Sequence, residues 1–218
     1  MSGIAWPEIL QATWQTLYMV GVSTFLAVVL GLPMGVFLVL FSTRTLIPTR
    51  WAYQALAVVV NIVRSVPFII LLIAIIPLTE WIVGTSIGVN AAIVPLTVGA
   101  APFYARVAET ALREVDSGVI EAAQAMGASV WQIVFRVLLP EARPGLIAGI
   151  TITAVTLVSY SAMSGVIGGG GLGDLAVRYG YERFETGVML VTTAILVVIV
   201  QFMQMLGDRL VRHYARRA

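Results

Sequence analysis

The chain is dominated by long uncharged apolar stretches, and the run from Thr13 to Phe41 alone contains no charged residue. A membrane-spanning helix needs about 20 such residues to cross ~30 Å of hydrocarbon. Of the 218 residues 59% are hydrophobic and 11% are charged, and four more apolar segments follow the first. Five membrane spans and their loops use up this length, so no second soluble domain fits. The pattern predicts an all-α integral membrane protein with five transmembrane helices in one domain, residues 1–218. The expected spans are about 13–41, 51–79, 87–105, 145–166 and 188–206.

Two residue types are missing from the sequence, and their absence excludes several functions. The chain contains no Cys, so disulfides, thiolate nucleophiles and Cys-bound metals are excluded. It also contains no Lys, although a P-loop needs a Lys for the phosphates of its nucleotide. The chain therefore cannot carry a standard ATP site of its own.

The second apolar segment is interrupted by Arg64, followed by Pro67. An Arg at the centre of a bilayer costs ~2.5 to 3.5 kcal/mol or more, so we expect it near an interface or facing protein and water. We expect a helix bent at Pro67 that crosses the membrane from about Val66 to Thr79, with Arg64 at the inner mouth. The alternative is that Arg64 only extends to the lipid headgroups.

The arginines indicate the orientation. The turn after the first span, the large loop 106–143 and the C-terminal tail hold ten Arg, whereas the opposite side holds Arg178 and Arg183. The side of a membrane protein that is rich in Arg faces the cytoplasm. We therefore expect the N-terminus outside, the C-terminus inside and loop 106–143 in the cytoplasm.

Loop 106–143 carries helix start and stop signals. Asp116 or Ser117 suits an N-cap, Gly127 suits a helix end, and Ser129 with Gln132 fits a capping box. We expect two short helices with a glycine elbow, and a break at Pro140 and Pro144 before the next span. The apolar side chains left on the hairpin are Ile120, Met126, Val130, Trp131, Ile133 and Val134. Such a hairpin suits docking into a groove of another protein or, alternatively, lying on lipid.

Small residues mark two of the spans. Gly31 and Gly35 form a small-xxx-small pattern around Pro33, which either lets a neighbouring helix approach closely or marks a tolerated kink. The segment 145–166 is rich in Gly, Ala, Ser and Thr, so we expect it between other helices.

The loop also resembles a known motif. Glu121-Ala122-Ala123, Gly127, Val137 and Leu139-Pro140 have the spacing of the EAA loop of ATP-binding cassette (ABC) importer permeases, with Val137 where Ile is usual. The strings NIVRSVPFIILL, GTSIGVNAAIVPLTVGAAPF and SYSAMSGVIGGGGLGDLAVRYGY resemble the methionine branch of that family along nearly the whole chain.

This resemblance implies a type I ABC-importer permease fold and a non-catalytic subunit in a bacterial inner membrane. It implies a homodimer with two ATPase subunits that bind ATP and Mg, and a periplasmic or lipid-anchored substrate-binding protein. Its cargo would be methionine, L and D, moved by alternating access among membrane lipids, with no cofactor or nucleic acid bound by this chain. Another amino acid or small solute is the alternative cargo. The residues expected to couple to the ATPase are Glu121, Ala122, Ala123, Gly127, Leu139 and Pro140.

For the translocation path and gate we expect Tyr160, Ser161, Met163 and Ser164, with Asn61 and Arg64 near the inner mouth. Tyr160 and Met163 are the bulky residues of a segment of small ones, so their symmetry mates in a homodimer could close the path. Ordinary helix packing is the alternative for each of them.

Two other classes fit less well. An ion-coupled secondary transporter needs intramembrane carboxylates, and the five expected spans contain no Asp or Glu. An intramembrane hydrolase needs a base beside a nucleophile, and the only histidine is His213 in the tail.

Overall fold

The computed structural model describes residues 6–42, 46–47 and 49–215. The described residues form helices and turns, with no strand among them. Arg44, Arg216 and Arg217, which the arginine count uses, lie outside the described residues.

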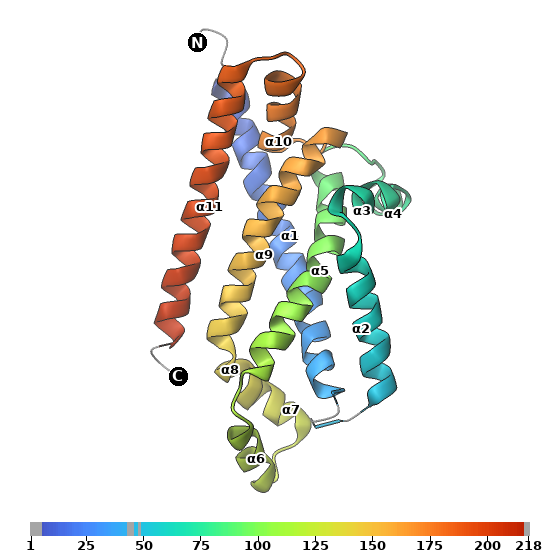
Figure 1. Cartoon of the computed structure of the whole chain (residues 1–218), viewed down its shortest axis with the longest axis vertical. Helices are drawn as coiled ribbons and strands as arrows, with labels where there is room; N and C mark the ends of the chain where they lie inside the picture. Colours follow the sequence, from blue (N-terminus) through green and yellow to red (C-terminus); the bar gives the residue numbers. More distant parts are fainter. Residues whose placement is uncertain (1–5, 43–45, 48, 216–218) are drawn as a thin grey trace.

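Four long helices run along the molecule (Figure 1). Their bounds are α1 Trp6–Leu40, α5 Val89–Arg113, α9 Arg143–Ser164 and α11 Thr186–Ala215. A fifth crossing comes from the pair α2 Arg50–Ser65 and α3 Phe68–Ala74 when the pair is counted as one span. The fold class predicted from the sequence, an all-helical membrane protein with five spans, agrees with this set.

The second segment differs from its expected course. Val66 takes an extended conformation because it precedes Pro67, and α2 and α3 meet at 103°. Helix α3 has seven residues and α4, Ile76–Val83, has eight, so each is only about 11 Å long. Figure 1 shows α2 along α5 while α3 and α4 turn aside. Helices α3 and α4 are therefore each too short to cross a membrane alone, and the part of this segment that crosses stays a prediction.

Helices α1 and α5 form the central pair of the bundle. An added Cβ at Gly31 would lie 2.5 Å from the Ala101 carbonyl oxygen, and one at Gly35 would lie 2.7 Å from that of Ala105. The two glycines thus allow the backbones to touch, which decides between the two interpretations of this pattern. Met19, Leu96, Ala100 and Leu157 continue the core where α9 joins the pair.

The two ends of the bundle differ in content. At one end the short helices α6 Ser117–Ala125, α7 Val130–Ile133 and α8 Leu139–Glu141 lie together, near the C-terminal ends of α1 and α11 and the start of α2 (Figure 1). The N-terminal end of α1 and α10, Gly171–Leu175, lie at the other end. This grouping is the one that the arginine count assumes. Which end faces the cytoplasm stays a prediction.

Candidate functional site

The first half of the hairpin between α5 and α9 is defined by its caps. The Asp116 carboxylate accepts a hydrogen bond from the Gly118 amide at 2.6 Å, so Asp116 and not Ser117 caps α6. At the other end the Ala128 amide donates to the Ala123 carbonyl and the Gly127 amide to that of Gln124, with Gly127 at φ +79°. This is a Schellman ending, which needs a left-handed residue at that place.

The second half begins as expected and ends later. Ser129 Oγ accepts from the Gln132 amide, and Gln132 Oε1 accepts from the Ser129 amide at 2.8 Å, which completes the capping box. Helix α7 then continues through a π-helical turn, η1 Val134–Leu138, into α8.

The expected break falls just after Pro140, because α8 ends at Glu141 and a turn at Ala142 precedes α9. Pro140 itself is still helical. A proline has no amide to donate, and in the preceding π-helical turn the Leu139 amide donates to the Val134 carbonyl, which moves the hydrogen-bond pattern by one residue.

One face of the hairpin is packed against the bundle. Ala123, Ile133, Val134 and Leu138 are buried in one cluster with residues of α1 and α5, among them Leu40 and Leu112. Two of the apolar side chains expected to remain on its surface, Ile133 and Val134, are thus in the core. This packing makes the hairpin a rigid extension of three long helices.

Other residues of the hairpin are exposed. Met126 and Trp131 are 82% and 51% exposed, and Ala122 and Gly127 are also exposed. Glu121 is exposed and forms no salt bridge with any described residue. It lines a groove of about 570 Å³ between the hairpin and the ends of α1 and α5, with Leu40 and Leu112 among the other lining residues. Leu139 and Pro140 are half-buried. The surface combines apolar side chains with one carboxylate, which suits a protein partner.

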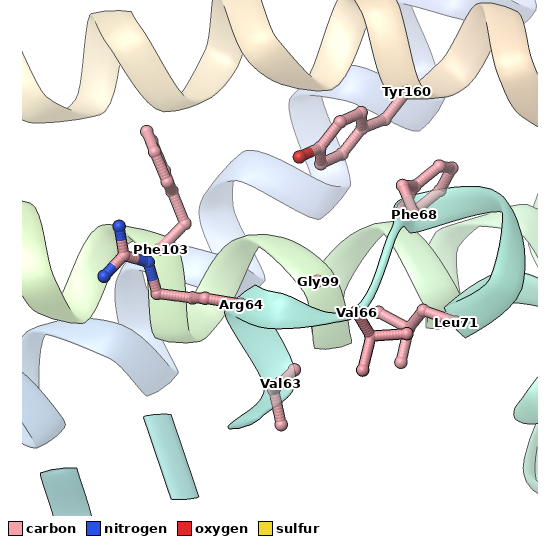
Figure 2. Close-up of a pocket in the computed structure, with 8 residues that line it drawn as sticks. All are labelled: Val63, Arg64, Val66, Phe68, Leu71, Gly99, Phe103 and Tyr160. Atoms are coloured by element: carbon pink, nitrogen blue, oxygen red, sulfur yellow. The ribbon is translucent and has the colours of Figure 1, made fainter. Parts of the chain in front are cut away.

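A second candidate site lies where α2 ends, between α5 and α9. Tyr160 stacks on Phe68 with ring centroids 4.3 Å apart, and the Arg64 guanidinium lies 5.9 Å from the centre of the Phe103 ring. Together with Gly99 these residues line a cavity of about 100 Å³ (Figure 2). Phe103 lies in the second half of α5, and the exposed Arg64 lies beside it. The expected place of Arg64 near the inner mouth stays a prediction.

The structure brings only some of the expected path residues together. Tyr160 and Arg64 share this cavity. Ser161 and Ser164 are buried, and their hydroxyls donate to carbonyls of their own helix, Val158 and Ser161. Met163 is 46% exposed on the surface of the subunit. In this conformation the two serines are part of the helix packing.

Asn61 leads to a network that the sequence reasoning missed. Its side-chain oxygen accepts a hydrogen bond from Arg106 at 3.0 Å, and Arg106 pairs with the Glu109 carboxylate at 2.6 Å. Arg113 binds the other oxygen of Glu109 at 2.7 Å and also reaches Ser42. The network joins α2, α5 and the end of α1.

The spacing of the three charged residues could have revealed this network. Arg106, Glu109 and Arg113 are separated by three and four residues, which places them on one helix face, but this reading requires α5 to continue beyond Ala105. Because it does, a buried carboxylate lies on α5 beyond the expected span, which ended at residue 105. Two guanidinium partners compensate its charge, so Glu109 lacks the isolated setting of a proton carrier.

Among the described residues no cluster of His, Asp or Glu has the composition of a metal site. The glycine-rich segment 168–173 is held in place, because Gln15 Oε1 accepts from the Gly171 amide and Thr16 Oγ1 from the Leu172 amide, both at 2.9 Å. That segment is an anchored turn between α9 and α10.

Comparison with known proteins gives matches over nearly the whole chain. Residues 27–218 match the family described as binding-protein-dependent transport system inner membrane component. A probable D-methionine transport system permease protein, MetI of Vibrio cholerae, is 54% identical over 209 residues, 96% of this chain and 93% of the relative. The methionine import system permease protein MetP of Bacillus subtilis is 46% identical, covering 92% and 90%.

Solved structures give the same result for the fold. An inward-facing crystal form of the MetNI methionine ABC transporter matches with a TM-score of 0.96 at 50% identity, covering 98% of this chain and 99% of that chain. An amino acid ABC transporter matches with a TM-score of 0.74 at 21% identity, covering 95% and 94%, which shows a shared fold only.

Proposed function

The chain belongs to the family of binding-protein-dependent transport system inner membrane components, and from this premise we propose that it is the permease subunit of an ATP-driven methionine importer. It moves L- and D-methionine into the cytoplasm by alternating access. The observation that carries the proposal is the rigid hairpin with an exposed carboxylate, in a chain that matches a methionine transporter over almost its full length.

The assembly contains two copies of this chain and two ATPase subunits, which bind ATP and Mg and hydrolyse the nucleotide. A periplasmic or lipid-anchored binding protein delivers the amino acid. The chain itself is non-catalytic, and the absence of lysine from its sequence agrees with an energy source in a partner.

The hairpin divides its coupling residues by exposure. Glu121, Ala122 and Gly127 are exposed and meet the ATPase, with Glu121 as polar anchor and Gly127 as the elbow. Ala123 is buried, and Leu139 and Pro140 are half-buried, so these three hold the hairpin to the bundle. Movement of the ATPase subunits then passes through the hairpin to α1, α5 and α9.

Translocation follows the face where Tyr160, Arg64 and Asn61 lie, with Met163 exposed beside it. Ser161 and Ser164 are buried, so they line the translocation path only if α9 rotates during transport. Selectivity for methionine resides mainly in the binding protein, because the cavity at Tyr160 is small and open.

Uptake of radiolabelled methionine by cells that express the chain with its cognate ATPase and binding protein tests the function. We expect ATP-dependent uptake that unlabelled L- and D-methionine inhibit, and that other amino acids at the same concentration do not. Uptake that persists without nucleotide but collapses with the ion gradient contradicts the proposal and favours a secondary transporter. If only a different amino acid inhibits uptake, the chain transports that amino acid and not methionine.

Gly127 tests the coupling role. Because no atom of the described chain lies within 4 Å of an added Cβ there, Gly127→Leu costs this subunit only the strain of φ +79°, about 1 to 2 kcal/mol. We expect Gly127→Leu to lose uptake, and the control Gly127→Asn, which tolerates that conformation, to retain it. Full ATP-dependent uptake by Gly127→Leu would refute the contact.

A further inference from the structure

Arg64 is the charged side chain that the fold leaves without a counter-charge beside the Tyr160 cavity. It forms no salt bridge and no hydrogen bond with any residue that the structure describes, and its guanidinium lies over the face of the Phe103 ring. Arg106, the next arginine on that side, is by contrast fully engaged with Glu109 and Asn61. Arg64 is exposed on the isolated subunit, so its guanidinium is accessible to an anion that enters the cavity from outside the chain.

The position of Arg64 along α5 leaves two sources for that anion. Gly99 and Phe103 begin about 15 and 21 Å along α5, which is about 37 Å long. The expected third span ends at residue 105, so Phe103 and the Arg64 guanidinium beside it lie near the inner end of that span. The carboxylate of a cargo and the phosphate of a lipid both reach such a position, and a labelling experiment separates them.

The geometry points to a carboxylate in transit, and we propose that Arg64 binds the α-carboxylate of the transported amino acid. This rests on the proposed function, which supplies an amino acid as cargo. In Figure 2 the Arg64 guanidinium and Phe103 lie at one end of the cavity, and Tyr160 and Phe68 lie at the other. The charged group of the cargo faces Arg64, and its side chain faces the stacked rings.

Arg64 recognises the carboxylate that all amino acids share, so the site is transient and does not select the side chain. An unpaired guanidinium attracts the anion electrostatically, and the aromatic rings offer apolar contact without hydrogen-bond specificity. Such a site lowers the barrier for a charged group inside the bundle and still releases it, as transport requires.

The absence of cysteine from the sequence allows a direct test. Gly99→Cys introduces one thiol into the cavity, and its Cβ meets only ordinary contacts, 3.4 Å from Leu71 and 3.5 Å from Phe68. The purified permease–ATPase complex in detergent is labelled with anionic and cationic methanethiosulfonate reagents, and modification of the permease band is followed over time. Gly187→Cys, with open space around its Cβ, is the control thiol outside the cavity.

We expect the thiol of Gly99→Cys to prefer the anionic reagent, and the additional change Arg64→Gln to reduce that preference by about tenfold. Arg64→Lys, which keeps the charge, should retain most of it. Millimolar methionine or alanine should slow labelling of Gly99→Cys, whereas methioninamide, which lacks the carboxylate, should not. Labelling of Gly187→Cys should respond to none of these ligands.

Equal reagent preference with and without Arg64→Gln overturns the proposal, and so does equal protection by methionine and methioninamide. A third outcome that overturns it is protection by phosphatidylglycerol in nanodiscs with no effect of methionine, because Arg64 then binds a lipid phosphate. The labelling needs neither ATP nor the binding protein. A failure of methionine uptake therefore contradicts the proposed function alone, while the labelling result decides the carboxylate site.

Discussion

The buried carboxylate of Glu109 binds two guanidinium groups at once, from Arg106 and Arg113, and is only 5% exposed. Through Arg106 it also holds Asn61 of α2, and through Arg113 it reaches Ser42 after α1. Three chain segments beside the hairpin are thus fixed by one side chain. Removing a partner from a buried charged network is costly because the remaining charges are left unpaired.

We expect Glu109→Gln to lower the stability of the purified complex by about 3 kcal/mol. The matched control is Asp174→Asn, which breaks an ion pair of similar length, 2.8 Å to Arg178, whose arginine side chain is 55% exposed. That pair should contribute no more than about 1 kcal/mol. Thermal unfolding of the two variants in one detergent measures the difference, and equal melting temperatures would show that the network is not structural.

At the scale of the element, the contact between α1 and α5 depends on two glycines that approach carbonyl oxygens. We expect Gly31→Val to force the helices apart and to reduce the yield of folded complex, at a cost of about 1 to 3 kcal/mol or more. Gly21→Val on the same helix is the control, because no atom lies within 4 Å of its added Cβ. Size-exclusion profiles of both variants after membrane extraction report the result, and similar profiles would exclude a packing role for Gly31.

The first turn of α6 offers a test of its cap. Asp116→Ala removes the acceptor of the Gly118 amide and should destabilise that turn by about 1 kcal/mol. Ser117→Ala, one residue later, removes no cap bond and should leave it unchanged. Hydrogen exchange at the first amides of α6 should be several times faster in Asp116→Ala only, and the reverse pattern would make Ser117 the cap.

Local signals in the sequence predicted the elements they control. The capping box joins Ser129 and Gln132, three positions apart, and the helix ending at Gly127 joins residues five positions apart at most. Both are present in the structure. The course of α3 and the burial of Ile133, in contrast, depend on packing between distant segments. The length of α5 was missed because charged residues were taken as loop, although Glu109 is neutralised within its own helix.

The same distinction holds for the candidate sites. The exposed hairpin residues that we propose to meet the ATPase belong to one contiguous motif, so spacing alone was enough to select them as candidates. The Tyr160 cavity is lined by residues of four separate helices. Which residues line it together depends on the 103° bend after α2, which the sequence does not give. A helical face such as that of Ser161 and Ser164 cannot be assigned to a path or to packing from an uncharged small-residue segment.

At the scale of the whole molecule, the two exposed sides of the subunit differ in chemistry. Only 11% of the most apolar window of α11 is buried, and its exposed side chains are aliphatic or aromatic over most of its length, as suits contact with lipid. Helix α2, in contrast, exposes Asn61 and Arg64 among its apolar side chains, and α9 exposes Met163. Because the polar and charged groups of α2 are costly in hydrocarbon, that helix requires cover from protein or water.

A second copy of the chain provides that cover in the proposed homodimer, and single cysteines test which side pairs. In a twofold interface a residue near the axis meets its own symmetry mate. We expect Met163→Cys, 46% exposed on α9, to form a disulfide-linked dimer on mild oxidation of membranes. Val198→Cys, 66% exposed on α11, should stay monomeric because two Cα atoms more than ~7 Å apart cannot be bridged.

Non-reducing gels distinguish the two variants directly, since the chain has no other cysteine. Dimers from Val198→Cys alone would place α11 at the interface and the Arg64 side toward lipid, which contradicts both the proposed path and its polar lining.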